Sequence, residues 1–495
     1  MLAIKQHPSL NSCEKRQNKK FQAMTEKLQQ TLRDSAGARW AALILIALMM
    51  FFAYMFVDVM SPLQTLIESE RGWTPNVFGT YAASEYILNV CGFLILAGII
   101  LDKMGVRFTG TLSASLMVVG AAIKYIAISD FFQDSALCTW LGSWWTAMPG
   151  SAKLACLGFM IFGCGCEMAG ITVSRAIAKW FAGKEMALAM GLEMAIARLG
   201  VFAVLSLSPF LAARFDQSVV APIAFCTVLL LIGLINFIVF SVMDRKLDKQ
   251  LGTGKEAGAE EDQFKFSDIK YIFGSKMFWL IALLCVLYYS AIFPFQRYAT
   301  NFLESTLTIP ADEAANIFRW FPILAMILTP VLGSFIDYKG KGASMLMYGA
   351  LIMIICHLSY AFILPAYPAK WLAFVITVVL GVSFSLVPAA LWPSVPKVID
   401  GKILGSAYAL IFWVQNIGLC FVPKIIGNVL NSTNPGVAEA RNQAMAQGGA
   451  MPAYDYTVPM IIFASFGVAA FLLGIWLKAE DKRKGYGLEL PNVKK

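Results

Sequence analysis

The sequence predicts an all-α membrane protein with twelve transmembrane helices in two pseudo-symmetric six-helix halves. Three observations predict this fold: a composition too apolar for a soluble surface, twelve apolar runs of spanning length, and a motif that recurs at the same place in each half. Of the 495 residues, 58% are hydrophobic and 14% are charged. A soluble domain carries about 25% charged residues, so much of this surface must face lipid.

The apolar runs are long enough to cross the hydrocarbon core, which takes about 20 helical residues. We expect spans at 40–61, 78–101, 107–128, 153–180, 186–213, 219–243, 277–303, 313–336, 343–364, 371–396, 403–430 and 457–478. The charged, Gly-containing stretch between the sixth and seventh spans reads as a linker. The predicted organisation is an N-terminal tail (1–39), an N-terminal half (40–243), a linker (244–275), a C-terminal half (276–478) and a C-terminal tail (479–495).

Basic residues are shared unequally between the two sides of the predicted bundle. With the N-terminus inside, 29 of the 40 Lys and Arg fall in inside segments and 5 in outside segments. Because Lys and Arg are retained on the cytoplasmic side, this bias predicts that both termini are cytoplasmic. The net charge of +9 then lies beside anionic lipid, so the bilayer explains it and no nucleic acid is needed.

The cysteines and histidines do not suggest a metal site. Cys164 and Cys166 form an isolated C-x-C with no nearby His, and the chain has ten Cys and two His in all. Cysteines in apolar runs usually act as small buried apolar residues. We expect no metal and no cofactor. No nucleophile–base pair is apparent either, so we expect no enzymatic activity.

A short motif follows the second predicted span of each half. It has the form G-x3-D-x2-G with basic residues close by, and its glycines permit a tight turn and close helix approach. The aspartate can pair with a helix N-terminus or with an Arg on a neighbouring helix, and such a contact can hold a gate shut in one conformation. The expected gating residues are Gly98, Asp102, Gly105, Arg107, Gly333, Asp337 and Gly340.

The first copy resembles the signature between the second and third helices of the major facilitator superfamily, and the second resembles its counterpart between the eighth and ninth. The second copy has Tyr338 where a basic residue is usual. The resemblance implies the major facilitator fold and a secondary transporter that works by alternating access. Repeated halves of this kind rock about a central site.

Ionisable residues inside predicted spans cost about 2.5–3.5 kcal/mol each to insert, so by default they are functional. Glu167 lies mid-span among small residues, and Arg198 lies near the middle of the next span. At 1.5 Å per residue the two are at similar depth. One interpretation is a structural ion pair. The other is a split site in which Arg198 binds a carboxylate and Glu167 binds an amine.

Further residues are candidates for the same cavity. Asp58 could contact the substrate, and either Asp58 or Glu85 could carry a proton. Aromatic and amide side chains of the second half could line the cavity, although membrane aromatics are more often packing or interface anchors. The lining candidates are Tyr289, Gln296, Trp392, Gln415 and Asn416.

Several stretches resemble the lysosomal dipeptide transporter branch of the superfamily and its bacterial relatives. They lie at 54–64, 167–200, 293–295, 391–393 and 404–419. The resemblance implies that Glu167 and Arg198 bind the two ends of a dipeptide, by facilitated diffusion without strict proton coupling. The accessory membrane subunit of that branch is not indicated by any feature of this chain.

Other functions stay open at this stage. A proton-coupled exporter or an organic-anion porter would use Arg198 for an anion and Glu167 for a proton. A solute sensor or scaffold would bind without transport. The short linker and plain tails favour a bacterial plasma membrane, with the lysosomal membrane as the alternative in a eukaryote.

Overall fold

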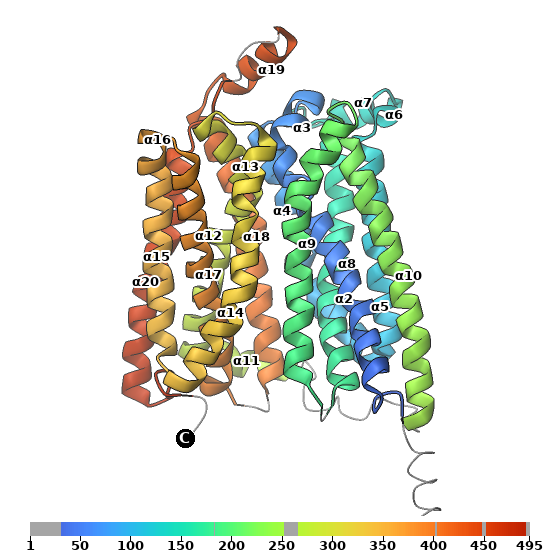
Figure 1. Ribbon diagram of the computed structural model, residues 1–495, viewed down its shortest axis with the longest axis vertical. Coiled ribbons are helices and arrows are strands. Elements are labelled where there is room, and N and C mark those ends of the chain that lie inside the picture. Colours follow the sequence, from blue (N-terminus) through green and yellow to red (C-terminus); the bar gives the residue numbers. More distant parts are fainter. Residues whose placement is uncertain (1–30, 183, 252–265, 401–402, 448–451, 492–495) are drawn as a thin grey trace, which may run out of the picture.

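The computed structural model describes residues 31–182, 184–251, 266–400, 403–447 and 452–491, and within them every regular element is helical. Two helical bundles stand side by side (Figure 1). This confirms the predicted fold class. Residues 1–30 of the predicted N-terminal tail and 252–265 of the predicted linker lie outside the described residues.

The N-terminal half contains six long helices and several short ones. The long helices are α2 (Ala36–Asp58), α4 (Pro75–Leu88), α5 (Leu94–Ile128), α8 (Gly150–Trp180), α9 (Met186–Arg214) and α10 (Val220–Leu251). The short ones are η1 (Ser61–Leu63), α3 (Gln64–Arg71), η2 (Asn89–Phe93), α6 (Asp130–Gln133) and α7 (Ala136–Ser143).

The C-terminal half repeats this arrangement. Its long helices are α12 (Lys276–Leu307), α14 (Trp320–Lys339), α15 (Gly342–Leu358), α17 (Lys370–Val398), α18 (Leu404–Thr433) and α20 (Thr457–Lys484). Its short ones are α11 (Phe266–Phe273), α13 (Ala311–Phe318), η3 (Ser359–Ile363), α16 (Leu364–Ala366) and α19 (Val437–Gln447).

Within the described ranges, eleven helical segments are long and apolar enough to cross a membrane. The longest, Pro75–Ile128, has 54 residues and would reach about 80 Å as one straight helix. Gly105 interrupts it with φ +74°, a conformation that favours glycine. This segment therefore crosses the bilayer twice, which gives the twelve predicted spans.

The two motif glycines share one backbone conformation. Gly105 has φ 74° and ψ 174°, and Gly340 has φ 75° and ψ −145°. Each ends the second span of its half and lets the chain turn into the third. The internal repeat read from the sequence is thus also a repeat in backbone geometry.

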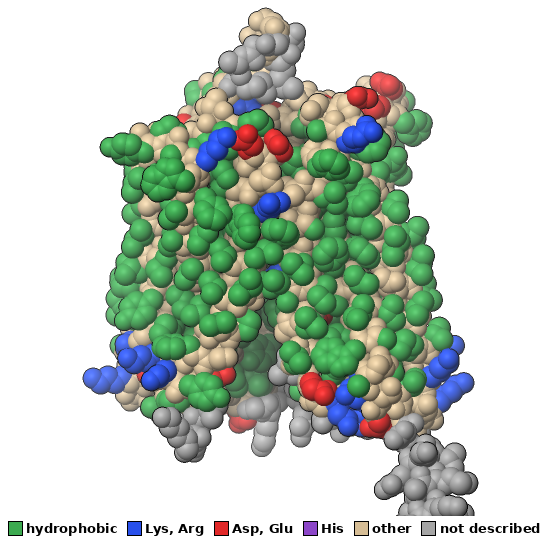
Figure 2. Space-filling model, in the orientation of Figure 1, with side chains coloured by type: hydrophobic (Ala, Val, Ile, Leu, Met, Phe, Trp, Pro, Cys, Tyr) green, Lys and Arg blue, Asp and Glu red, His purple; other side chains and the backbone are tan. Residues whose placement is uncertain are grey.

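The bundle has two ends, which we name from the chain. The terminal face is where α2 begins at Ala36 and α20 ends at Lys484. The distal face is the opposite end and carries α3, α6, α7 and α19 (Figure 1). Hydrophobic side chains cover the band between the faces, and charged side chains gather toward both ends (Figure 2).

The halves touch at the distal face, and the surface is hollowed between them at the terminal face (Figure 2). Near the distal face, Tyr298 of α12 donates to the carbonyls of Pro75, at 3.3 Å, and Pro423, at 3.0 Å. Side chains at Gly79 or Gly427 would collide with the carbonyls of Pro423 and Pro75. Close approach of α4 and α18 therefore requires glycine at these two positions.

Gly427→Val should prevent closure of the distal face, because its side chain would collide with the backbone of Pro75 across the interface. A cysteine at Ser305, which is 7% exposed, should then react with a membrane-impermeant maleimide about tenfold faster or more, as expected for a shift of about 1.4 kcal/mol toward the open state. Gly191→Val, with open space around it, is the matched control. Equal labelling in the two variants would contradict this account.

Candidate functional site

Glu167 lies on α8, about 20 Å along the helix from its terminal-face end at 1.5 Å per residue. The glycines that precede it allow α8 to pack tightly. A side chain at Gly163 would collide with the backbone of Glu85 on α4, and one at Gly165 would lie 2.6 Å from the carbonyl of Ser113 on α5. The small residues thus bring three helices together beside Glu167.

Arg198 lies on α9, about 18 Å from the terminal-face end of that helix. Its guanidinium carbon lies 5.5 Å from the ring centroid of Phe384, which belongs to α17 of the other half. Phe384 in turn contacts Tyr289 and Phe293 of α12, with ring centroids 5.8 and 5.6 Å away. Arg198 therefore faces an aromatic wall across the interface.

Glu167 and Arg198 do not form an ion pair with each other or with any other side chain in the described ranges. Both are only partly buried, and the hydroxyl of Tyr54 on α2 lies within electrostatic range of both. Two opposite charges at one depth therefore remain without a protein partner. A structural pair between them is not formed in this conformation.

Glu193 is a further acid in this region that sequence reasoning did not single out. It lies on α9 five residues before Arg198, is 8% exposed and is also within electrostatic range of Tyr54. Its place inside the predicted span 186–213 was the available signal. It forms no ion pair among the residues described.

The remaining lining candidates belong to the C-terminal half. Trp392 Nε1 donates to the Tyr289 hydroxyl at 3.3 Å, and its ring stacks on Phe412 with centroids 4.8 Å apart. Gln415 is 8% exposed and its Oε1 accepts from Cys285 Sγ at 3.2 Å. These contacts fix the aromatic wall in place.

Asn416 and Gln296 are held within the protein rather than turned to open space. Asn416 is 1% exposed and donates to the carbonyl of Phe412 at 3.1 Å. Gln296 Nε2 donates to Asp58 Oδ2 at 2.7 Å. Their side-chain amides are therefore engaged in packing contacts in this conformation.

Asp58, Glu85 and Arg297 form a buried ion cluster between the two halves. Arg297 Nη1 lies 3.1 Å from Asp58 Oδ1, and Nη2 lies 2.5 Å from Glu85 Oε2. The three residues are 1%, 5% and 7% exposed respectively. Because the acids belong to α2 and α4 and the base to α12, the cluster ties the halves together.

Arg297 was not selected as a site residue from the sequence, because it lies six residues before the expected span end at 303, where a long side chain can reach the interface. The structure places it ten residues before the end of α12 and buries it. Helix α12 continues to Leu307, beyond the predicted span end at 303. The error arose because the span boundary read from hydropathy was short.

Lys124 of α5 lies beside this cluster in an aromatic cage. Its Nζ lies 4.1, 5.2 and 4.7 Å from the ring centroids of Phe56, Tyr81 and Phe159. It is fully buried and has no hydrogen-bond partner among the described residues. Cation–π contacts therefore replace the missing hydrogen bonds.

The family model described as Major Facilitator Superfamily matches residues 46–423, which is well over half of the chain. The chain belongs to the major facilitator superfamily. This membership makes it a multi-pass membrane transporter of small-molecule substrates. This confirms the resemblance to the superfamily that the two sequence motifs indicated.

Curated relatives within the superfamily carry the name lysosomal dipeptide transporter MFSD1. The Danio rerio protein is 28% identical over 403 residues, covering 79% of this chain and 81% of its own. The Homo sapiens protein is 25% identical over 404 residues, covering 80% of each. The chain is similar to these proteins across most of both halves.

Solved structures of superfamily transporters share the fold. The nucleoside transporter NupG superimposes with a TM-score of 0.62 at 13% identity, covering 88% of this chain and 99% of its own. A bacterial homolog of the human lysosomal transporter Spinster, inward-facing and unoccupied, gives 0.65 at 12%, covering 91% and 98%. At these identities the likeness concerns the fold alone.

The first superfamily motif forms an ion-pair network within the N-terminal half. Asp102 lies 2.7 Å from Arg175 of α8, the kind of partner expected from the sequence. Arg107 lies 3.1 Å from Asp244 of α10 and also pairs with Asp248. These contacts fasten α10 as it continues to Leu251, past the predicted span end at 243. The gating role itself stays a prediction.

The second motif contacts the C-terminal tail. The backbone N–H of Lys341 donates to the carbonyl of Glu489 at 2.9 Å, and that of Gly342 donates to Leu488 at 3.0 Å. A side chain at Gly340 would collide with Glu489. Asp337 lies within electrostatic range of Lys397, whereas Gly98 and Gly333 have open space around them.

Arg297→Met should destabilise the protein by about 3–5 kcal/mol, because it leaves two buried carboxylates without their base. Lys124→Met should cost less, about 2 kcal/mol, since it loses only desolvated cation–π contacts. Thermal unfolding of the purified variants in one detergent measures both. A larger loss for Lys124→Met than for Arg297→Met would contradict the assignment of Arg297 as the central base.

Proposed function

We propose that this transporter carries dipeptides or similar small zwitterions by alternating access. The observation that carries the proposal is that Glu167 and Arg198, two opposite charges at similar depth, have no ion-pair partner in the described part of the chain. Their similar depth on α8 and α9 lets one small solute reach both. Similarity to proteins named as dipeptide transporters supports this substrate class.

The energetics favour a solute with two charges. A buried charge without a partner is costly, and a bound counter-charge removes that cost. A zwitterion supplies a carboxylate to Arg198 and an amine to Glu167, whereas a solute with one charge leaves the other residue unpaired. The guanidinium suits the carboxylate because its planar fork donates two parallel hydrogen bonds.

Glu193 offers a second acceptor for the amine. It shares the neighbourhood of Tyr54 with Glu167 and is equally without an ion-pair partner in the described chain. A short dipeptide would use one acid, and the other would be free to bind a proton or a longer solute. Glu193→Gln therefore belongs in the same experiment.

The aromatic wall of Tyr289, Phe293, Phe384 and Trp392 provides apolar contact for solute side chains. Aromatic surfaces bind many side chains with little geometric demand. We therefore expect broad tolerance of side chains and strict demand for the two charged ends.

Two alternatives use the same residues differently. An organic-anion porter or proton-coupled exporter would need Arg198 for an anion and would retain transport of simple carboxylates in Glu167→Gln. A sensor or scaffold would bind solute with no time-dependent uptake. The unpaired acid at the depth of Arg198 favours the zwitterion carrier.

We also propose an orientation of the protein in the membrane. The basic N-terminal and C-terminal segments favour cytoplasmic termini, so the terminal face would be cytoplasmic and the open hollow would face the cytoplasm. The plain tails favour a bacterial plasma membrane. For a eukaryotic source, the similarity to relatives named as lysosomal transporters favours the lysosomal membrane.

A labelled dipeptide should accumulate in liposomes that contain the purified protein, and free amino acids should not compete. Arg198→Gln should reduce uptake about 100-fold or more, since a buried charge-assisted contact is lost. Arg214→Gln on the same helix, where the side chain is exposed, is the matched control. N-acetylated and C-amidated dipeptides should be poor substrates of the wild type.

Glu167→Gln should lose transport of the free dipeptide and gain relative activity toward the N-acetylated one. The variant lacks the carboxylate, and the N-acetylated dipeptide lacks the charged amine that the carboxylate would pair with. If Glu193→Gln shows that pattern instead, Glu193 holds the amine. Absence of dipeptide flux at every pH tested would refute the proposed substrate class while leaving the fold intact.

Of two reporters fused after Lys495, the one that is active in the cytoplasm should work and the one that is active in the periplasm should not, because the C-terminal tail follows α20 at the terminal face. Fusions of a cytoplasmic fluorescent protein and of a periplasmic phosphatase at this position measure the orientation. The same fusions after Ser432, in the last turn of α18 at the distal face, should give the opposite pattern. A periplasmic C-terminus would overturn the proposed topology.

A further inference from the structure

A second polar cluster joins the halves at the distal face, beyond the ends of predicted spans 40–61 and 277–303. Thr65 and Glu68 lie on α3 of the N-terminal half. Glu304 lies on α12 and Arg441 on α19, both of the C-terminal half. We call these four residues the distal cluster.

One guanidinium serves both acids of the distal cluster. Arg441 Nε lies 3.3 Å from Glu68 Oε2, and Arg441 Nη2 donates to Thr65 Oγ1 at 3.0 Å. The Thr65 hydroxyl donates in turn to Glu304 Oε2 at 2.6 Å. Arg441 therefore reaches Glu68 directly and Glu304 only through a hydroxyl.

The ion pair at the centre of the distal cluster is removed from water. Glu68 and Arg441 are each 2% exposed, and Glu304 is partly buried. Tyr454, itself 3% exposed, donates to Glu68 Oε1. Burial, followed by the charge of Glu68, raises the pKa of Tyr454 well above its ordinary value. Its hydroxyl therefore remains a donor and brings no charge.

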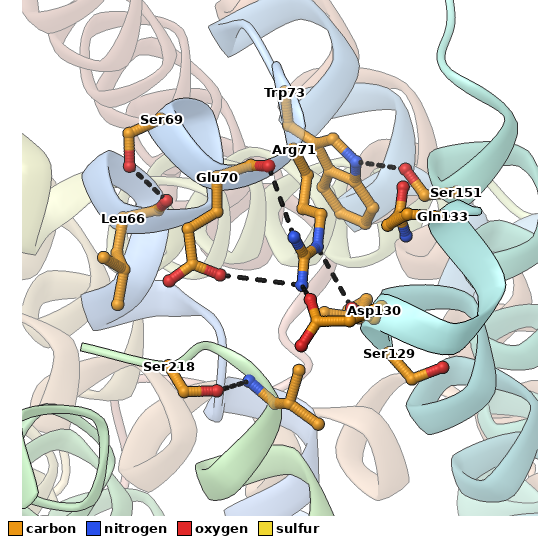
Figure 3. Close-up of polar contacts among 12 residues, drawn as sticks. Leu66, Ser69, Glu70, Arg71, Trp73, Ser129, Asp130, Gln133, Ser151 and Ser218 are labelled. Atoms are coloured by element: carbon orange, nitrogen blue, oxygen red, sulfur yellow. Dashed lines mark hydrogen bonds and ion pairs between the residues drawn. The ribbon is translucent and has the colours of Figure 1, made fainter. Parts of the chain in front are cut away.

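No second cation reaches these acids within the described ranges. On α3, Arg71 is directed to Asp130, at 2.5 Å, and to Glu70, at 3.7 Å (Figure 3). On α19, the exposed side chain of Glu439 adds negative charge near Tyr454. Tyr456, packed between α12 and the segment after α19, donates to Asn301 and carries no charge.

The distal cluster thus holds two carboxylates and one guanidinium, an excess of one negative charge. Glu68 Oε2 is buried and accepts no hydrogen bond within the described chain. Two carboxylates that share one base in a dry site cannot both stay ionised without cost, and a proton removes that cost.

We propose that the distal cluster is a proton-binding site that takes up one proton as the distal face closes and releases it as the face opens. When the halves separate there, Thr65 and Glu68 leave with the N-terminal half, and both carboxylates regain water. The closed state therefore binds the proton more tightly than the open state.

The sign of the pH effect follows from linkage. The state that holds more protons is favoured as pH falls. Acid on the distal side therefore stabilises the distal-closed, terminal-open conformation. The proton enters and leaves on the same side, so this site regulates the conformational equilibrium and does not couple flux to a proton gradient.

The test uses spin labels at two exposed distal positions, Phe131 in the N-terminal half and Tyr367 in the C-terminal half, on full-length protein in lipid nanodiscs. Distances are measured from about pH 7.5 to about pH 5.5, a range in which buried carboxylates commonly titrate. No solute is added, so the result does not depend on the proposed substrate. The short-distance population of the wild type should grow with acid, by up to about tenfold for each tenfold difference in proton affinity between the states.

Glu304→Gln should hold the short distance at every pH, because the neutral amide replaces the protonated acid. Glu304→Asp should keep the pH response, which shows that the site folds and titrates. Asp312→Asn, an exposed acid on α13 of the same half, is the matched control and should behave as the wild type. A wild type that does not respond to pH, or an unchanged response in Glu304→Gln, would overturn the proposal.

Discussion

The need to pair charges away from water, using groups from both halves, organises this transporter. At mid-depth Arg297 of α12 pairs with Asp58 and Glu85 of the other half, so separating the halves there would leave both carboxylates without their base. Toward the distal face, Arg441 of the C-terminal half forms a similar ion pair with Glu68 of the N-terminal half. Glu167 and Arg198 form no ion pair within the described chain, and in the proposed function a solute supplies the missing counter-charges.

Small residues set how closely the helices carrying these charges approach. Gly163 packs on the backbone of Glu85, and Gly79 and Gly427 bring α4 and α18 together. Within the described chain, the hydrogen bonds and ion pairs between the halves involve N-terminal-half residues at distal or middle depth, from Val57 to Ser206. The packing explains why the present conformation is open at the terminal face.

Fold class and repeat could be predicted because both depend on local sequence. A span needs only a sustained apolar run, and a turn at positive φ needs a glycine, as Gly105 and Gly340 illustrate. The depth of Glu167 and Arg198 followed from helix rise. The bridging role of Arg297, the neighbourhood of Glu193 and the contacts of Arg441 could not be predicted, because each depends on which helices meet in the folded protein.

The most direct test of the central claim is the distance between spin labels at Met186 and Tyr338, which lie at the terminal face on α9 and on α14 of the other half. A saturating dipeptide should shorten this distance in the wild type, because a solute held by Glu167 and Arg198 of the N-terminal half then also contacts the aromatic wall of the C-terminal half. An unchanged distance in the presence of a dipeptide that the protein demonstrably binds would contradict the account.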